Sequence, residues 1–224
     1  MDASQIWMAN DVTNVYFFIQ GRVDAPNPNS GLLFLINTSN LAGVAAGTSL
    51  GGVAPVTTHI FSNTNDAAFP LSNSTVNWKM DFETDRAWFG SPVSSSFSID
   101  KANYDGIPGG AFLGTSSLAG NIGVFGGESH AFNNGSLSGG PGSSTGWEMS
   151  IPRANLGGIV DAATVEAYAI VATSSASFSD DASPGTFVGN AGFNPDFNAS
   201  PYAATMEHGG AVPVPVIVSQ FSIE

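Results

Sequence analysis

The sequence predicts an all-β protein, and three observations lead to this prediction. Short runs rich in Val, Ile, Phe, Tyr and Thr recur between clusters of Gly, Asn, Pro and Ser, a pattern typical of strands joined by turns. The 3.6-residue apolar period of an amphipathic helix is nearly absent. A length of 224 residues suits a single sandwich domain. We therefore expect residues 1–224 to form one all-β sandwich domain.

The positions of the apolar runs give the expected strands. The clearest are Asn14–Gln20, Gly31–Asn37, Thr75–Phe82, Ser96–Asp100, Ile122–Phe125, Trp147–Ile151, Val165–Thr173 and Val214–Ile223. Weaker signals lie near His59–Phe61, Ala111–Leu113 and Ser129–Phe132. The runs Tyr16–Ile19 and Leu32–Ile36 are continuously apolar, which predicts strands covered on both faces.

The segments between the strands are mostly turn formers. Asn40–Pro55 and Asn133–Gly146 are long stretches of low complexity with little to bury, so we expect surface loops there. One short helical turn is predicted at residues 152–157. Pro152 suits its first position, and Gly157 suits its C-terminal cap.

The composition restricts the function. Eighteen acidic residues against five basic ones give a formal net charge of −13, which repels nucleic acid and anionic membranes. No apolar run approaches the ~20 residues that span a bilayer. Cysteine is absent, which excludes disulfides and thiolate chemistry. Since only 10% of the residues are charged, the surface must be rich in Ser, Thr, Asn and Gly. This composition favours an exported bacterial or archaeal protein, extracellular or at the cell surface.

Five segments carry a resemblance to a known family. They are DASQIWMANDVTNVYFFIQGRV, GLLFLINT, VNWKMDFETDRAWFG, GWEMSIPRANLGG and VEAYAIVAT. In this order, along most of the chain, they resemble β-sandwich domains of exported bacterial surface proteins, which are similar to family 9 carbohydrate-binding modules and to DOMON-type domains. The resemblance implies a non-catalytic, jelly-roll-like β-sandwich of roughly ten antiparallel strands. Related modules bind sugars through exposed aromatic residues and often carry structural calcium, and DOMON-type relatives bind haem or sugar.

The resemblance also bears on assembly. Such domains usually have a strand ahead of the segment that corresponds to Asp2–Ala9, so we expect this strand to lie outside the sequence or to come from another chain. A sheet edge left open in this way would allow pairing with a neighbouring strand. The run AVPVPVIVSQFSIE near the end of the sequence is a strong β-former that could pair with a neighbour or complete the chain's own sheet.

Calcium is the candidate cofactor, because loops rich in Asp and Asn supply the oxygen ligands that it prefers. The candidate metal ligands fall in three loops and comprise Asp24, Asn27, Asn29, Asp180, Asp181 and Asp196. The alternative in each loop is ordinary turn chemistry, in which the side chains bind their own backbone. Asp81, Glu83 and Asp85 alternate along an expected strand and would share one face, where the simpler interpretation is solvent exposure.

Four aromatic residues are the candidate sugar ligands: Trp88, Trp78, Trp7 and Tyr104. The alternative is burial, since aromatic residues on sandwich strands usually pack in the core. We expect Trp88 to be the most exposed of the four, because it follows the strand expected at Thr75–Phe82 and would lie in a turn.

Catalysis is not expected. The sequence has no HExxH zinc motif and no GxxxxGK phosphate loop, and no motif identifies an acid and base among its carboxylates. His130 lies two residues after Glu128, but no methionine pairs with a histidine in a pattern typical of haem ligation. We therefore predict a non-catalytic structural or adhesive module that associates with other copies of itself or with matrix proteins through sheet edges. The alternative is a carbohydrate-binding module with a polysaccharide ligand.

Overall fold

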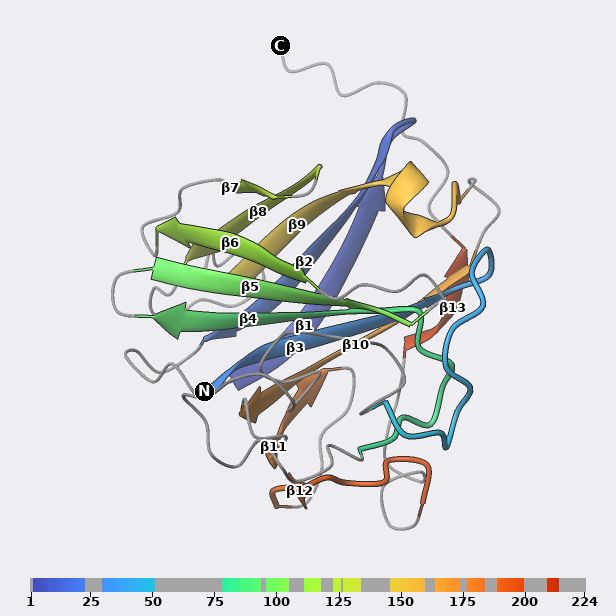
Figure 1. Ribbon diagram of the computed structural model, residues 1–224, viewed down its shortest axis with the longest axis vertical. Coiled ribbons are helices and arrows are strands. Elements are labelled where there is room, and N and C mark those ends of the chain that lie inside the picture. The colour runs from blue at the N-terminus through green and yellow to red at the C-terminus, as the bar shows by residue number, and fades with distance from the viewer. Residues whose placement is uncertain are drawn as a thin grey trace.

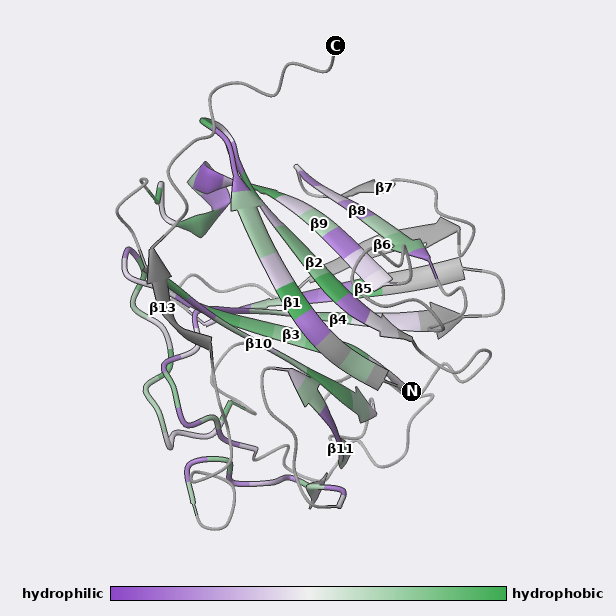
Figure 2. Cartoon of the chain, turned by 180° about the vertical axis from the view of Figure 1, so that it is seen from behind, coloured by the Kyte–Doolittle hydropathy of each residue, from purple (hydrophilic) through white to green (hydrophobic). Residues whose placement is uncertain are grey.

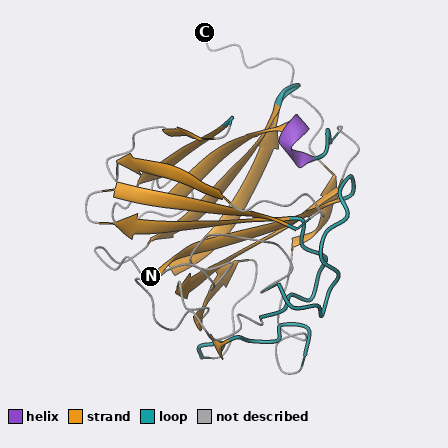
Figure 3. Ribbon diagram, viewed as in Figure 1, coloured by secondary structure: helices purple, strands orange, loops and turns teal. Residues whose placement is uncertain are grey.

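A computed structural model describes most of the chain. The described residues are 2–22, 30–50, 78–93, 96–104, 111–117, 123–125, 127–133, 146–159, 164–173, 177–183, 189–199 and 209–213 (Figure 3). They form two antiparallel β-sheets with one short 3-10 turn (Figure 1). The predicted all-β sandwich is therefore confirmed.

The smaller sheet has five strands. In spatial order they are β1 (Asp2–Asn10), β2 (Asn14–Arg22), β9 (Gly146–Pro152), β8 (Glu128–Asn133) and β7 (Gly123–Phe125). Strands β1 and β2 form a hairpin, so β1 is one edge of this sheet and the three-residue β7 is the other.

The larger sheet has eight strands. Its main order is β12 (Gly192–Phe193), β11 (Ser177–Ser183), β10 (Thr164–Thr173), β3 (Ser30–Thr38), β4 (Arg86–Val93), β5 (Ser96–Asn103) and β6 (Ala111–Ser117). The remaining strand, β13 (Gly209–Pro213), also pairs with β10. Strand β1 contacts β10 and β11 across the sandwich, and β6 contacts β7 and β8.

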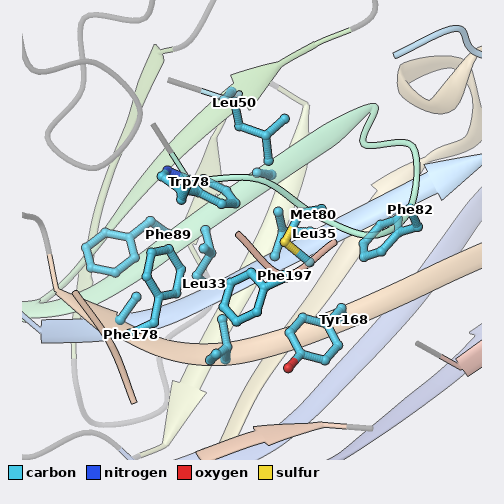
Figure 4. Packing of buried hydrophobic residues seen from close by; sticks show 14 of the residues in the cluster. Leu33, Leu35, Leu50, Trp78, Met80, Phe82, Phe89, Tyr168, Phe178 and Phe197 are labelled. Atoms are coloured by element: carbon cyan, nitrogen blue, oxygen red, sulfur yellow. The ribbon is translucent and has the colours of Figure 1, made fainter. Parts of the chain in front are cut away.

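Two apolar cores lie on the opposite faces of the larger sheet. The core between the sheets contains Phe17, Phe34, Trp88 and Trp147. The second core lies on the outer face, where Leu33, Leu35 and Phe89 pack under residues of the segments 44–50, 78–82 and 191–197 (Figure 4). Strand β3 contributes to both cores, which explains its continuous apolar run and confirms that it is covered on both faces.

The second continuous run, in β2, was predicted to be covered on both faces as well. Val15, Phe17 and Ile19 are buried, but Tyr16 and Phe18 are only half-buried. Strand β2 therefore presents one face to the core between the sheets and leaves its other face partly open, so the prediction was wrong for β2.

The strand expected at Thr75–Phe82 is not a strand in its described part. Residues 78–85 make isolated bridges, from Lys79 to Ser49 and from Thr84 to Val44, and form part of the cover over the outer core. The regular strand begins only at Arg86. The segment lies on the outer face of the larger sheet, and every second residue is apolar and buried against that face. The result is the same alternation of apolar and polar residues that a strand shows.

The loop expected at Asn40–Pro55 was predicted to have little to bury. In its described part, Val44 and Leu50 are 6% and 1% exposed and belong to the outer core. The segment is irregular, as expected, but it covers the sheet instead of standing free of it.

The helical turn was predicted correctly. It is a 3-10 turn at Arg153–Leu156, and Leu156 is buried. Gly157 caps it with φ 74°, a left-handed conformation that glycine adopts without steric cost, and its N–H bonds to the Arg153 carbonyl.

Other strand predictions had mixed outcomes. The expected strands at Asn14–Gln20, Gly31–Asn37, Ser96–Asp100, Trp147–Ile151 and Val165–Thr173 lie within β2, β3, β5, β9 and β10. The expected strand at Ile122–Phe125 overlaps β7, and the weaker signals at Ala111–Leu113 and Ser129–Phe132 fall within β6 and β8. The expected strands at His59–Phe61 and Val214–Ile223 lie outside the described residues, as does most of the expected loop Asn133–Gly146.

Candidate functional site

The candidate interaction surface is the outer edge of β1. This nine-residue strand pairs with β2 along one side, and within the described ranges no strand pairs with its other side (Figure 2). Its backbone N–H and C=O groups on that side are placed to pair with another extended chain.

The hairpin turn that holds β1 is fixed by one carboxylate. Asp11 Oδ1 accepts hydrogen bonds from the backbone N–H groups of Thr13 and Asn14, at 2.7 Å each, and Oδ2 accepts one from the Tyr16 hydroxyl at 2.6 Å. The Tyr16 hydrogen bond and then the backbone donors hold the pKa of Asp11 well below its usual range. The turn residues therefore set the register of β1 against β2.

The side chains of β1 separate into two faces. Ile6 and Met8 pack against the core between the sheets, while Gln5, Trp7 and Ala9 are exposed. Trp7 is 48% exposed, and Val12 beyond the end of the strand is 72% exposed. A register shift between Ala3 and Gln5 returns Ala3 to the buried face at the start of the strand.

The edge of β1 lacks the features by which proteins usually prevent edge pairing. Its sequence DASQIWMAN contains neither Lys nor Pro, and its only bulge lies near its start. By contrast, β7 and β12, at other sheet edges, have only three and two residues. The edge strand β6 has seven residues and, like β1, contacts the opposite sheet. Strand β1, with nine residues, is the longest edge among the described strands.

A buried polar cluster joins the two sheets. Glu128 of β8 is 1% exposed, and its Oε2 accepts a hydrogen bond from Trp88 Nε1 of β4 at 2.8 Å. Its Oε1 is paired with Lys101 Nζ of β5 and lies 3.4 Å from Asn155 Nδ2 of the 3-10 turn. Lys101 Nζ also lies 5.3 Å from the centre of the Trp88 ring, a cation–π contact.

His130 extends this cluster within the smaller sheet. Trp147 Nε1 donates to His130 Nδ1 at 3.3 Å, and since an indole N–H can only donate, Nδ1 is the acceptor. The proton of the neutral ring is then on Nε2, which lies 3.5 Å from Glu128 Oε2. This tautomer directs an N–H group at the carboxylate.

The cluster holds Glu128 ionised. Burial alone would raise its pKa, but the hydrogen bond from His130, the charge of Lys101 and the hydrogen bonds of Lys101 and Trp88 outweigh burial and lower the pKa to about 2. The carboxylate is enclosed and surrounded by donors, an arrangement typical of a structural tie between sheets.

The predicted aromatic residues do not lie together. Trp88 is 0% exposed in the core between the sheets, so the expectation that it is exposed at a turn was wrong, because it lies inside β4. Trp78 and Tyr104, at 0% and 3% exposed, are buried in the outer core. Of the four, only Trp7 presents its ring to solvent.

The predicted metal ligands are similarly dispersed. Asp24, Asn27 and Asn29 lie outside the described residues. Asp180 and Asp181 are half-buried on β11, and Asp196 Oδ2 lies 2.7 Å from Lys79 Nζ, while its Oδ1 accepts from Asn198 N. Asp196 is thus engaged in an ion pair and a turn. Among the residues that the structure describes, no three His, Asp or Glu side chains gather as a metal site.

The alternating acids were predicted to share one face towards solvent, and the structure gives them separate roles. Asp85 is 0% exposed, and its Oδ2 accepts hydrogen bonds from Thr38 N at 2.6 Å and Thr38 Oγ1 at 3.1 Å. Glu83 Oε1 accepts from Gly43 N at 2.8 Å. Burial raises the pKa of Asp85 to about 6, against the hydrogen bonds from Thr38. Glu83 joins its segment to the covering segment that follows β3, and Asp85 joins it to the end of β3 itself, so the expectation of three exposed carboxylates was wrong.

Sequence reasoning identified Glu128 and His130 as neighbours but gave no sign of their partners. Lys101 and Trp88 lie 27 and 40 residues away from Glu128 in the sequence. The E-x-H spacing places both side chains on one face of a strand, and the sequence predicts nothing further about this cluster.

The described residues form an antiparallel β-sandwich in which the outer edge of β1 has no strand partner. Comparison with protein-family models, with curated proteins and with solved structures gave no match. In the described part of the chain, no helix is both long and apolar enough to cross a membrane.

Proposed function

We propose that this chain is a non-catalytic extracellular or cell-surface module that self-associates by pairing β1 with β1 of a second copy. The observation that carries the proposal is the nine-residue edge of β1, which has no strand partner on its outer side among the described residues. Pairing of two such edges extends one sheet across two subunits and satisfies both rows of backbone groups.

The charge distribution along β1 favours an antiparallel pair. Asp2 is its only ionisable residue and lies at its first position. In an antiparallel pair centred on Ile6, each Asp2 position lies opposite Asn10 of the other copy, so the two Asp2 positions are roughly 27 Å apart at about 3.4 Å per residue. A parallel pair in register would instead place them side by side. A two-fold axis through Ile6 also makes the interface self-complementary.

The same register uses the exposed aromatic residue. Trp7 of one copy lies opposite Gln5 of the other, and directly opposed side chains in antiparallel strands are about 4.5–5.5 Å apart at Cβ. The indole ring would then cover the junction between the strands. Burial of this exposed ring supplies apolar contact that backbone pairing alone lacks.

The composition supports the location and the absence of catalysis. A chain without cysteine, with a net charge of −13 and few charged residues is suited to the outside of a prokaryotic cell. The densest carboxylate and histidine cluster of the described residues is enclosed between the sheets. A buried carboxylate that is already surrounded by donors supports a structural role.

Sedimentation of the wild type and of two matched variants tests the proposal. Trp7→Asp places two carboxylates near the centre of the β1 pair, where they are diagonal neighbours across the strands, and is expected to give a monomer. Val12→Asp makes the same change at an exposed apolar position beyond the end of β1 and is expected to leave the dimer intact. A wild type that stays monomeric at high concentration, or two variants that dissociate equally, would show that β1 is not the interface.

A further inference from the structure

The face of the smaller sheet that points away from the core between the sheets carries two neighbouring aromatic side chains. Strands β1, β2, β9 and β8 present this open face to the viewer in Figure 2. Trp7 on β1 is 48% exposed, and the half-buried Phe18 lies directly opposite it on β2. Side chains in directly opposed positions are about 4.5–5.5 Å apart at Cβ. Trp7 and Phe18 therefore form one aromatic patch across the β1 and β2 hairpin.

The ring of Phe18 lies over the neighbouring strand β9. A Cβ atom added to Gly146 of β9 would lie 2.9 Å from Cε2 and Cζ of Phe18, so the ring occupies the space that a side chain would need. Glycine inside a strand often marks such a close approach. The ring thus extends along the surface of the sheet instead of standing away from it. This leaves a low apolar surface that a second sheet can approach.

The open face is nearly uncharged, although the chain has a net charge of −13. Side chains alternate between the two faces of the sheet, and the outward positions hold mainly amide, hydroxyl, alanine and aromatic groups. Among the outward side chains that the structure describes on β1, β2, β9 and β8, Glu148 alone is charged at neutral pH. A strongly charged partner finds little to bind here. A second copy of this acidic chain meets the least repulsion at this face.

The β1 pair proposed above doubles the aromatic patch, and the present inference rests on that pairing. A two-fold axis through Ile6, perpendicular to the sheet, keeps the open faces of both copies on the same side. Within each copy Trp7 pairs with Phe18, and Gln5 pairs with Gln20. Since Trp7 lies opposite Gln5 of the other copy, two rows cross the four central strands, about 7 Å apart. Each row contains one Phe18 and one Trp7, within a width of about 14 Å.

Pairing of the β1 edges leaves this doubled patch uncovered. The edge contact is one strand wide, whereas stable interfaces bury about 1,200–2,000 Å² in total. An aromatic side chain contributes roughly 150–250 Å² when it is fully buried. The two Trp7 and two Phe18 side chains of a β1 pair therefore offer apolar area on the order of a few hundred Å², the size of patch that marks an interaction site.

We propose that two β1-paired dimers stack open face to open face, so that Trp7 and Phe18 of four copies form the centre of a tetramer. Stacked sheets lie about 10 Å apart, a separation that interdigitated side chains fill. Because neighbouring strands are rotated by about 20–25°, contact is closest at the central strands and opens towards the rim. Glu148 lies at this rim, since β9 is the third strand from the axis. Perpendicular two-fold axes close the assembly at four copies.

Sedimentation velocity over a series of protein concentrations tests the proposal. The wild type is expected to form a dimer and, at higher concentration, a tetramer. Phe18→Thr should raise the dissociation constant of the tetramer by about tenfold or more and leave the dimer intact, which also shows that the variant folds. Phe193→Thr is the matched control, because Phe193 is 53% exposed on β12, at an edge of the larger sheet. It should leave both association steps unchanged.

Acrylamide quenching of tryptophan fluorescence reports the contact at the open face directly. Of the four tryptophans, Trp78, Trp88 and Trp147 are 0% exposed, so the accessible emission comes from Trp7. In the β1 pair the side of Trp7 on the open face remains accessible, and in the tetramer it is covered. Quenching should therefore fall several-fold as the tetramer forms. It should stay high in Phe18→Thr at the same concentration.

The two proposals fail in different ways. A dimer that never proceeds to a tetramer overturns the stacking and supports the β1 pair, whereas a wild type that stays monomeric overturns both. A single association step that Phe18→Thr abolishes would show that copies meet without pairing β1, which contradicts both. Equal loss of the tetramer in Phe193→Thr overturns the assignment to the open face. Protection of Trp7 by a cello-oligosaccharide, without a tetramer, would assign this face to a carbohydrate and overturn the stacking.

Discussion

Trp88 Nε1 and Glu128 Oε2, 2.8 Å apart, join the two sheets of the sandwich through one buried hydrogen bond. Trp88 belongs to β4 of the larger sheet and Glu128 to β8 of the smaller one. With Lys101 on the same carboxylate, this contact fixes how the sheets lie against each other. It also makes Glu128 the residue whose charge bears most directly on the stability of the fold.

Glu128→Gln is expected to lower the free energy of unfolding at pH 7 by about 3 kcal/mol. This value corresponds to the lowering of the Glu128 pKa from 4.5 to about 2, at about 1.4 kcal/mol per pKa unit. Because the pKa of Glu128 is lowered, the stabilisation is present above pH 4.5 and is lost as the pH falls towards 2. Urea unfolding at a series of pH values measures this difference, which should narrow over that interval. Glu148→Gln, at an exposed position on β9, is the control and should change little at any pH. A pH-independent difference would contradict the assignment.

Asp85→Asn is expected to stabilise the protein at pH 8 by about 1 to 3 kcal/mol, because it removes a buried charge and retains an oxygen for Thr38 N. Burial raises the pKa of Asp85 in the folded protein to about 6. The wild type therefore keeps its full stability below pH 3.8 and loses about this amount as the pH rises through 6. The two proteins should therefore be closest in stability below pH 3.8, diverge between pH 3.8 and pH 6, and differ by a constant amount above pH 6. Chemical unfolding at pH 4 and pH 8 checks this, with Asp180→Asn as the control. Equal stabilities at pH 8 would show that burial does not penalise the charge.

Self-association through β1 should strengthen with salt. Each copy carries a net charge of −13, so the copies repel one another, and only Asp2 is ionisable within the proposed interface. Raising the ionic strength from about 0.01 M to about 0.15 M shortens the Debye length from about 30 Å to about 8 Å and screens this repulsion. Sedimentation velocity should show the dimer dissociation constant falling several-fold over this range. Dissociation of the dimer by salt would instead indicate an interface held by ion pairs.

Calcium binding remains a prediction, and thermal unfolding with and without a chelator checks it. A calcium ion that binds only the folded chain at 100 times its dissociation constant stabilises by about 2.7 kcal/mol, which corresponds to a rise of roughly 5–10 °C in Tm. Addition of magnesium in place of calcium controls for ionic strength. An unchanged Tm after chelation would contradict the prediction that the protein binds calcium.

The sequence predicted the fold class because burial leaves a local pattern. Leu32–Ile36 is apolar at every position, and β3 is covered on both faces. The same reasoning failed at residues 78–85, because Trp78, Met80 and Phe82 alternate with polar residues and yet belong to a segment that lies across the sheet. An alternating pattern reports which side chains are buried and does not report whether the backbone pairs with a neighbouring strand.

The candidate surfaces were predicted less well, for a physical reason that differs from case to case. Trp88 was assigned to a turn because the acids before it marked the preceding segment as a strand, whereas the strand begins at Arg86. Asp180 and Asp181 were predicted as metal ligands in a loop, whereas they lie on β11, whose irregular pairing with β10 cannot be read from its own residues. Exposure of Trp7 follows from the position of β1 at the edge of its sheet, and strand order cannot be read from one strand's residues.

The pairing of β3 with β10 has a consequence for the order in which this chain can fold. Ser30 lies opposite Thr173 and Thr38 opposite Val165, so β3 obtains this neighbour only after more than 120 further residues have been synthesised. Until then β3 lacks one of its two neighbouring strands, and closure of the long loop between β3 and β10 is slow. A nascent chain would therefore carry an exposed, aggregation-prone strand through most of its synthesis. We expect the native sandwich to form only after β10 has been synthesised and has left the ribosome, in a late step that brings β10 onto β3.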